Sequence, residues 1–303
     1  MKKWLSLLCA VWVLLGMNTA FSEEGKMNQD AWKEIQNALA ADFDNPVPKE
    51  QRILIGNSQL SPYHEKNLEA GFSNVVLLST DSENIKENFG RSLAIMACRV
   101  NLDTGEARAL LLPRNALTLI EEKSKSTELK YVNCFGGPLL TLREINESLN
   151  LSMDRYMAVN MDMVSRMVDA VGGVTLNLSE SEAQALGLPS GEQNVSGPQA
   201  LSYATLRRGY ESTARMLNLL STLLSKVKGL EVKEALNLVD VILLSSDTNL
   251  TVDDVIDLVF ALFGQETPGE IRLENLPMDE DGTLGPAARE KAFDFMYGVE
   301  EEE

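Results

Sequence analysis

Two arginines flank a predicted β-hairpin and could together bind a phosphate or a diphosphate. The apolar segments 93–100 and 107–112 are predicted to be buried strands, and Asp103-Thr104-Gly105 between them has the composition of a tight turn. Arg91 lies twelve residues before Asp103 and Arg114 eleven residues after it, so the folded hairpin is expected to bring both guanidinium groups to its open end. Arginine stays charged and presents a planar fork of donors that matches phosphate oxygens. The alternative is that both are ordinary surface residues at strand ends.

The overall charge excludes several other classes of function. The chain has 27 basic and 45 acidic residues, a formal net charge of −18. This excess of negative charge argues against nucleic acids and anionic membrane surfaces as non-specific partners. The single histidine, His64, has no neighbours at metal-ligand spacing, which argues against a zinc site or a histidine-activated nucleophile.

The first 22 residues are predicted to be a signal peptide or a membrane anchor. Two lysines precede the apolar run 4–17, and Ala20-Phe21-Ser22 has the small-x-small pattern of a cleavage site. The run is shorter than the roughly 20 apolar residues of a membrane-spanning helix, which favours cleavage. With either fate we expect the remaining chain to be extracytoplasmic, either secreted or anchored at the cell envelope.

The remainder is predicted to be one α/β domain whose mixed β-sheet is flanked by helices on both faces. We interpret the polar residues 23–50 as a stalk, 51–297 as the domain and 298–303 as an acidic tail. Strands mixed with helices and no linker-like break predict this fold class. Strands are expected at 52–55, 75–78, 93–100, 107–112, 131–132, 174–178 and 271–276, and helices at 141–149, 159–171, 199–206, 217–227, 232–244, 251–263 and 286–296.

Capping and cysteine patterns complete the residue-level predictions. Thr141 and Thr251 each precede an acidic residue by three positions, the pattern of a helix capping box. Cys98 and Cys134 are the two cysteines beyond the signal segment. They could pair, but buried free thiols are favoured, because a scaffold of this length can bury a sufficient core without a disulfide.

Several short motifs follow one another in a characteristic order. They are VVLLSTDS (75–82), GRS (90–92), LLPRN (111–115), YVNCFGG (131–137), VNMDMVSRMVDAVGGVTLNL (159–178) and SGPQALSYATLRR (196–208), followed by Arg215. Each motif is weak alone. Their order, their spacing and their strand, loop and helix contexts together resemble the LytR–CpsA–Psr family of bacterial cell-envelope proteins, from about residue 74 to about residue 277.

The resemblance implies a substrate and a set of site residues. Members of the family move an anionic glycopolymer from a polyprenyl diphosphate onto peptidoglycan outside the membrane. Their arginines bind the diphosphate, their acidic residues bind Mg²⁺, and an apolar tunnel takes the lipid. By position, the resemblance implies ligand binding by Arg91, Arg114, Arg207 and Arg215, with Arg114 and Arg207 as the catalytic candidates and Asp81 as the metal ligand. The implied partners are a polyprenyl (pyro)phosphate lipid or wall glycopolymer close to the outer membrane leaflet.

The chain departs from the family pattern mostly at acidic positions. The family's Arg-Ser-Asp-Thr motif ends in Leu93 and Ala94 here, and the aspartate after its Pro-Arg is Asn115. Other departures are Glu83 in place of an arginine, Thr205 in place of the first arginine of Arg-x-Arg, and Ser212-Thr213-Ala214 in place of Asp-Phe-Gly.

These departures predict a site that binds better than it catalyses. Phosphoryl transfer relies on a metal to neutralise developing charge and on a group that activates the acceptor. Loss of a general base alone typically slows the chemical step by about 10²–10⁴-fold. Leu93 cannot bind Mg²⁺, and Asn115 offers one neutral oxygen. We therefore hypothesise an attenuated transferase. The alternative is a non-catalytic envelope protein that binds a polyprenyl-phosphate lipid or wall polymer.

Overall fold

The computed structural model describes residues 52–55, 69–82, 84–85, 89–206, 215, 218–219, 222–223, 225–227, 230, 232–263 and 269–298. The predicted signal segment, the stalk, His64, Arg207, residues 217, 220, 221 and 224 of the expected helix 217–227, and nearly all of the acidic tail lie outside these residues. Two compact units are present, one formed by Met1–Val159 with Asp247–Glu303 and the other by Asn160–Ser246. Within the described ranges, none of the helices is both long enough and apolar enough to span a bilayer.

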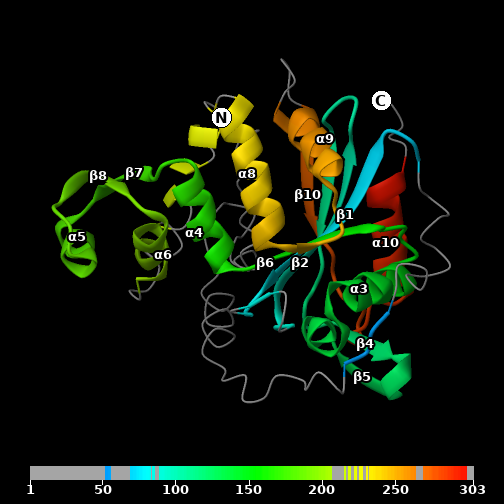
Figure 1. Ribbon diagram of the computed structural model, residues 1–303. Helices are drawn as coiled ribbons and strands as arrows, with labels where there is room; N and C mark the ends of the chain where they lie inside the picture. Colours follow the sequence, from blue (N-terminus) through cyan, green and yellow to red (C-terminus); the bar gives the residue numbers. More distant parts are fainter. Residues whose placement is uncertain are drawn as a thin grey trace. The chain divides into compact units, whose positions relative to one another are not determined.

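The first unit contains a mixed sheet of six strands (Figure 1). Across the sheet, the order is β10 (Ile271–Asn275), β3 (Ala107–Leu111), β2 (Ser92–Asn101), β1 (Phe72–Thr80), β6 (Arg155–Val159) and β9 (Asp247–Thr248). The pairs β1–β6 and β3–β10 are parallel, and the other three pairs are antiparallel. The β2–β3 pair is the predicted hairpin. Its turn uses Gly105 at φ 71°, and Gly105 N donates to Asn101 O over 2.9 Å.

Helices cover both faces of this sheet, which confirms the predicted fold class. On one face, Leu78, Ile95 and Leu110 are buried in a core shared with α3 (Leu129–Leu149) and α10 (Pro286–Tyr297). On the other face, α9 (Val252–Phe263) packs Ala261 against Val100 and Ala107. Strands buried on both faces are expected to be apolar at successive positions, which explains why 75–78 and 93–98 are nearly unbroken apolar runs.

Two of the expected short strands are not formed. Residues 52–55 carry no strand, although Ile53 N donates to Phe135 O over 2.7 Å. Residues 131–132 lie inside α3, where the helical conformation places Val132 fully buried in the core. The Gly136-Gly137-Pro138 sequence still interrupts the backbone: Gly137 has φ 73° and ψ −168°, which kinks α3.

The predicted capping box at Thr141 is also wrong, because Thr141 lies within α3. Its Oγ1 donates to Gly137 O over 3.1 Å. Glu144 is instead part of a buried ion-pair network with Arg143, whose Nη2 lies 2.9 Å from Glu144 Oε1. Arg143 also binds both carboxylate oxygens of Glu122, at 2.5 and 2.8 Å. The network ties α3 to the hairpin formed by β4 (Leu117–Ile120), η3 (Glu121–Lys123) and β5 (Lys125–Glu128), which the sequence did not indicate.

This network predicts a specific pH dependence of stability. The hydrogen bond from Arg143 lowers the pKa of Glu122. The ionised Glu122 therefore stabilises the folded state above the pKa that this group has in the unfolded chain, and this stabilisation is lost as the pH falls through the lowered pKa. Burial raises the pKa of Glu144, so the folded state holds that proton more tightly and loses stability as the pH rises through the raised pKa. A difference of one bound proton changes the unfolding free energy by about 1.4 kcal/mol per pH unit. We therefore expect Glu144→Gln to reduce the loss of stability between about pH 4.5 and neutral pH, measured by urea unfolding. An unchanged pH profile would contradict this.

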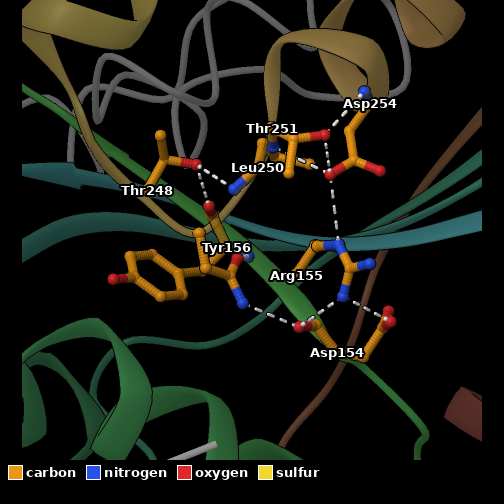
Figure 2. Close-up of polar contacts among 8 residues, drawn as sticks. Asp154, Arg155, Tyr156, Thr248, Leu250, Thr251 and Asp254 are labelled. Atoms are coloured by element: carbon orange, nitrogen blue, oxygen red, sulfur yellow. Dashed lines mark hydrogen bonds and ion pairs between the residues drawn. The ribbon is translucent and has the colours of Figure 1, made fainter.

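Polar contacts join β6, β9 and the start of α9 (Figure 2). The Asn249 Oδ1 accepts from Tyr156 N over 2.8 Å, and the Asn249 Nδ2 donates to Asp154 O over 2.9 Å. Arg155 pairs with Asp154 at 2.9 Å through Nη1. Thr251 and Asp254 exchange the reciprocal bonds of a capping box, with Asp254 N donating to Thr251 Oγ1 over 3.1 Å. The predicted cap at Thr251 is confirmed.

The second unit combines helices with a two-stranded sheet. Its elements are α4 (Met161–Ala170), β7 (Val174–Leu178), α5 (Glu180–Leu186), β8 (Gly191–Val195), α6 (Gly197–Thr205) and α8 (Val232–Ser245). The predicted strand 174–178 and the predicted helices near 199–206 and 232–244 are confirmed. The expected helix 159–171 begins later, since Val159 ends β6 and Asn160 is the N-cap of α4, accepting from Met163 N.

Candidate functional site

Asp81 and Arg91 form an oriented ion pair at one end of the sheet. Asp81 follows β1 and Arg91 precedes β2, and the last recorded pair of these antiparallel strands is Thr80 with Ser92. The strand ladder therefore brings the two residues opposite each other. Asp81 Oδ2 accepts from Arg91 Nε over 2.8 Å, and Asp81 Oδ1 accepts from Arg91 N over 2.6 Å. The backbone contact holds the carboxylate in place, and the contact from Nε then orients the guanidinium group.

The local backbone explains why this pair forms. A Cβ at Gly90 would lie 2.5 Å from Asp81 Oδ1 and 2.5 Å from Ser82 N, so only glycine allows this close approach. The strand register shifts at this point, since Ser79 pairs with Ala94 and Thr80 with Ser92. Leu93 is thus an extra residue in a β-bulge, a feature that often redirects a side chain beside an active site.

The close approach at Gly90 gives a direct test of the site. We expect Gly90→Ala to separate Asp81 from Arg91, because the added methyl group occupies the position of the carboxylate contact. The expected cost is about 1–3 kcal/mol of unfolding free energy, measured by chemical denaturation. Gly172→Ala is the control, because no heavy atom of the described residues lies within 4 Å of a Cβ there, although its φ of 74° also disfavours alanine. Equal costs for the two variants would contradict a specific role of the contact at Gly90.

The first turns of α3 hold the loops of both predicted arginines. Lys130 N donates to Arg114 O over 2.8 Å. Asn133 Nδ2 donates over 2.7 Å to the backbone oxygen of Gly90, the residue before Arg91. Position 130 contributes its backbone N–H and position 133 its side chain, three residues apart at the start of the helix. The backbones that carry Arg91 and Arg114 are therefore attached about one helical turn apart, although the hairpin pairing itself ends at Leu111.

Three buried polar atoms lie next to the ion pair without a hydrogen-bond partner in the described structure. They are Thr80 Oγ1, Ser92 Oγ and Asn133 Oδ1. Burying such groups unpaired costs about 1–3 kcal/mol each, and unsatisfied groups of this kind need a specific explanation. Sequence reasoning missed all three, because hydroxyl and amide residues in apolar segments give no motif. It also missed Arg52, whose guanidinium lies 4.8 Å from the centre of the Phe89 ring.

Cys134 is buried beside the same pair. Burial is the main cause that raises its pKa to about 12, with the Asp81 carboxylate raising it further and Arg91 lowering it. Cys98 and Cys134 are both free and buried, which confirms the predicted thiols. A thiol that stays protonated is a poor nucleophile, so Cys134 acts as a packing residue.

The described residues do not form a donor set that fits Mg²⁺. Mg²⁺ is usually bound by one or two carboxylates together with substrate phosphates. Both oxygens of Asp81 accept from Arg91, and Asn115 Oδ1 accepts from Lys130 Nζ over 3.1 Å. The bulged position holds Leu93. Across the described ranges, no cluster of three or more His, Cys, Asp or Glu residues is arranged to hold a metal ion.

Arg215 lies in the second unit and binds the C-terminal end of α6. Its Nε donates to Tyr203 O over 3.1 Å, its Nη2 donates to Leu206 O, and its Nη1 lies 3.8 Å from Glu182 Oε1. A cation at the last carbonyls of a helix stabilises them. This structural contact accounts for the burial of Arg215, and its ligand role stays a prediction. Arg207 lies outside the described residues.

Comparison with known proteins gives a family model and structural relatives. The model described as the LytR_cpsA_psr family matches residues 35–289. A protein of Bacillus anthracis named polyisoprenyl-teichoic acid–peptidoglycan teichoic acid transferase TagU is 26% identical over 198 residues, covering 65% of this chain and 62% of the relative. A Bacillus mycoides protein of the same name is 30% identical over 135 residues, 44% of each chain. The matches thus cover less than two thirds of the length of these curated relatives.

Solved structures show the same fold at low identity. B. subtilis TagV superposes with a TM-score of 0.54 and 16% identity, over 77% of this chain and 100% of the other. The structure described as YwtF (TagT) with bound octaprenyl pyrophosphate lipid gives a TM-score of 0.51 and 19% identity, over 82% and 100%.

Proposed function

Because the chain belongs to the LytR–CpsA–Psr family, we propose that it is an extracytoplasmic protein of the cell envelope that binds a polyprenyl diphosphate-linked glycopolymer. The curated relatives are named as polyisoprenyl-teichoic acid–peptidoglycan teichoic acid transferases, and one structural neighbour is described with bound octaprenyl pyrophosphate lipid. The reaction class that follows is transfer of the polymer to peptidoglycan, with the diphosphate as the group held by arginines.

The arrangement of Arg91 carries this proposal. Asp81 fixes its guanidinium group at 2.8 Å, and α3 holds the loops of Arg91 and Arg114 through the side chain of Asn133 and the backbone N–H of Lys130. A fixed arginine loses less freedom on binding a diphosphate than a mobile one does. Oriented positive charge would also stabilise the negative charge that develops on the leaving diphosphate. Arg114 and Arg207 remain the proposed catalytic candidates.

We further propose that transfer is attenuated. Mg²⁺, where bound, would neutralise diphosphate charge, and Asp81 is the carboxylate that remains to hold it. Both Asp81 oxygens already accept hydrogen bonds from Arg91, so ligation of Mg²⁺ would have to compete with the ion pair. The residues present therefore bind and orient the diphosphate but fit the metal poorly.

A second candidate is a non-catalytic envelope protein that binds a polyprenyl-phosphate lipid or wall polymer. The residues at the two replaced acidic positions favour it. The side chain of Leu93 has no polar atom, and Asn115 Oδ1 is hydrogen-bonded to Lys130. Both candidates share the same binding site and differ only in the chemical step.

The test separates binding from transfer. Residues 23–303 are purified, the co-purified lipid is identified by mass spectrometry, and Mg²⁺-dependent cleavage of a polyprenyl diphosphate is assayed. We expect bound polyprenyl phosphate or diphosphate and slow or no turnover. Turnover at the rate of an active family member assayed in parallel would overturn the attenuation. Absence of lipid affinity, with a folded protein, would overturn the binding proposal.

A further inference from the structure

A groove in the first unit lies away from the Asp81–Arg91 pair. It has a volume of about 630 Å³ and is lined by Arg108, Arg272, Leu273, Glu274, Asp294, Phe295 and Gly298. This volume falls within the range of small-molecule sites. Arg108 pairs with Arg99 across β2 and β3, and Arg99 is eight residues beyond Arg91. At about 3.3 Å per residue, the groove is roughly 26 Å from the ion pair.

Positive charge reaches the groove from two neighbouring strands. Arg108 of β3 and Arg272 of β10 are register partners, so their side chains project from the same face of the sheet. Arg108 Nη1 donates to Phe295 O over 3.0 Å and to Gly298 O over 2.8 Å. These bonds hold its guanidinium in place against the last turn of α10. Among the described residues, Arg108 Nε and Nη2 have no recorded partner, and they can donate to a carboxylate.

Negative charge faces the groove from α10. Asp294 is exposed, and its carboxylate has no recorded partner among the described residues. The other carboxylate of the lining, Glu274, is partly neutralised by Lys291, whose Nζ lies 3.4 Å from Glu274 Oε2. Asp294 is therefore the group of the lining that can pair with an added cation.

We propose that this groove binds a short peptide that carries both a free ammonium group and a free carboxylate. Arg108 would receive the carboxylate together with Arg272, whose Nη2 also pairs with Glu270 Oε2 at 3.0 Å. Asp294 would receive the ammonium group, and Phe295 would contact the apolar part between them. A simple anion fits less well, because Asp294 would repel it in a chain of net charge −18. The inference does not depend on the proposed function, because it uses none of the same side chains.

The test uses trialanine, its N-acetylated form and its C-terminal amide, titrated into the purified chain and followed by NMR or calorimetry. We expect saturable binding of trialanine and at least fivefold weaker binding of each capped form. Asp294→Asn should weaken binding of trialanine at least fivefold but leave the N-acetylated form unchanged. Arg272→Gln should weaken binding of trialanine but leave binding of its C-terminal amide unchanged.

The control is Arg166→Gln, which removes an exposed arginine of the second unit paired with Asp162. It should bind like the unmodified chain, and all variants should keep the same unfolding midpoint. No saturable binding of trialanine, or equal binding by all three variants, would overturn the proposal. Tighter binding of a sugar-free wall stem peptide with both termini free than of trialanine would support a wall peptide as the ligand, and equal binding would support free peptides in general.

Discussion

A chain that carries both Leu93→Asp and Asn115→Asp should gain Mg²⁺-dependent cleavage of a polyprenyl diphosphate by about 10²-fold or more over the unmodified chain. The physical reason is the number of carboxylates around Arg91. Asp81 now uses both oxygens on Arg91. A second carboxylate at the bulge would share the guanidinium group and leave an Asp81 oxygen for the metal.

The surroundings of both positions can accept the added charge. Leu93 is partly exposed and sits in a bulge two residues from Arg91. At position 115, the side-chain oxygen already accepts from Lys130 Nζ over 3.1 Å, so an aspartate would find a cation in place. Opposite charge within hydrogen-bonding distance favours the ionised carboxylate. The paired substitution is therefore expected to be tolerated, which unfolding midpoints would check.

The matched control is Leu93→Asn in the chain that keeps Asn115. It has nearly the shape of the restored site but adds no charge. Activity is measured as Mg²⁺-dependent release of the polymer from the lipid, with EDTA as the metal-free condition. A gain of Mg²⁺-dependent activity in the double aspartate variant but not in the Leu93→Asn control supports an intact transfer site that lacks only metal ligands. No gain, with unchanged lipid binding, contradicts the attenuated transferase and supports the non-catalytic candidate.

The residues of the site differ in how far sequence could predict them. Arg91 was predicted because it precedes an apolar strand whose pairing is set by burial on both faces, whereas Asp81 was implied only by the family resemblance. The β2–β3 hairpin followed from its turn residues. The attachment of both arginine loops to α3 was not predicted, because it depends on Lys130 and Asn133, in a stretch where residues 131–132 were expected to be a strand.

The errors have one physical origin. The apolar and β-branched residues near position 132 suit a strand and a buried helix equally, and the Gly-Gly-Pro sequence that follows ends either element. The segment is helical because Leu129 and Val132 are then both buried in the core. In the same way, Glu144 matched a capping box in sequence, but its side chain pairs with Arg143 because both are buried beneath the β4–β5 hairpin. Local patterns cannot show which neighbour a buried charge will meet.

Arg91→Gln should weaken binding of a polyprenyl diphosphate by about 30–100-fold, the loss expected for a hydrogen bond to a charged group. It should also lower stability by about 1–3 kcal/mol, because Asp81 loses the guanidinium group and keeps only the hydrogen bond from the backbone N of residue 91, in a site where its side chain is only 21% exposed. Arg91→Lys keeps the charge but loses the fork of donors, so an intermediate loss of binding is expected. Binding is measured with a fluorescent polyprenyl diphosphate, and stability by chemical unfolding.

A double variant separates the structural role of Arg91 from its role as a ligand. In Arg91→Gln with Asp81→Asn, the unpaired carboxylate is removed and an amide pair can take the place of the ion pair, so most of the lost stability should return. If Arg91 binds the diphosphate directly, affinity stays low although the protein is stable. If Arg91 only holds Asp81 and the end of β2 in place, affinity recovers together with stability. Recovery of both would therefore contradict the assignment of Arg91 as the diphosphate ligand on which the proposed function rests.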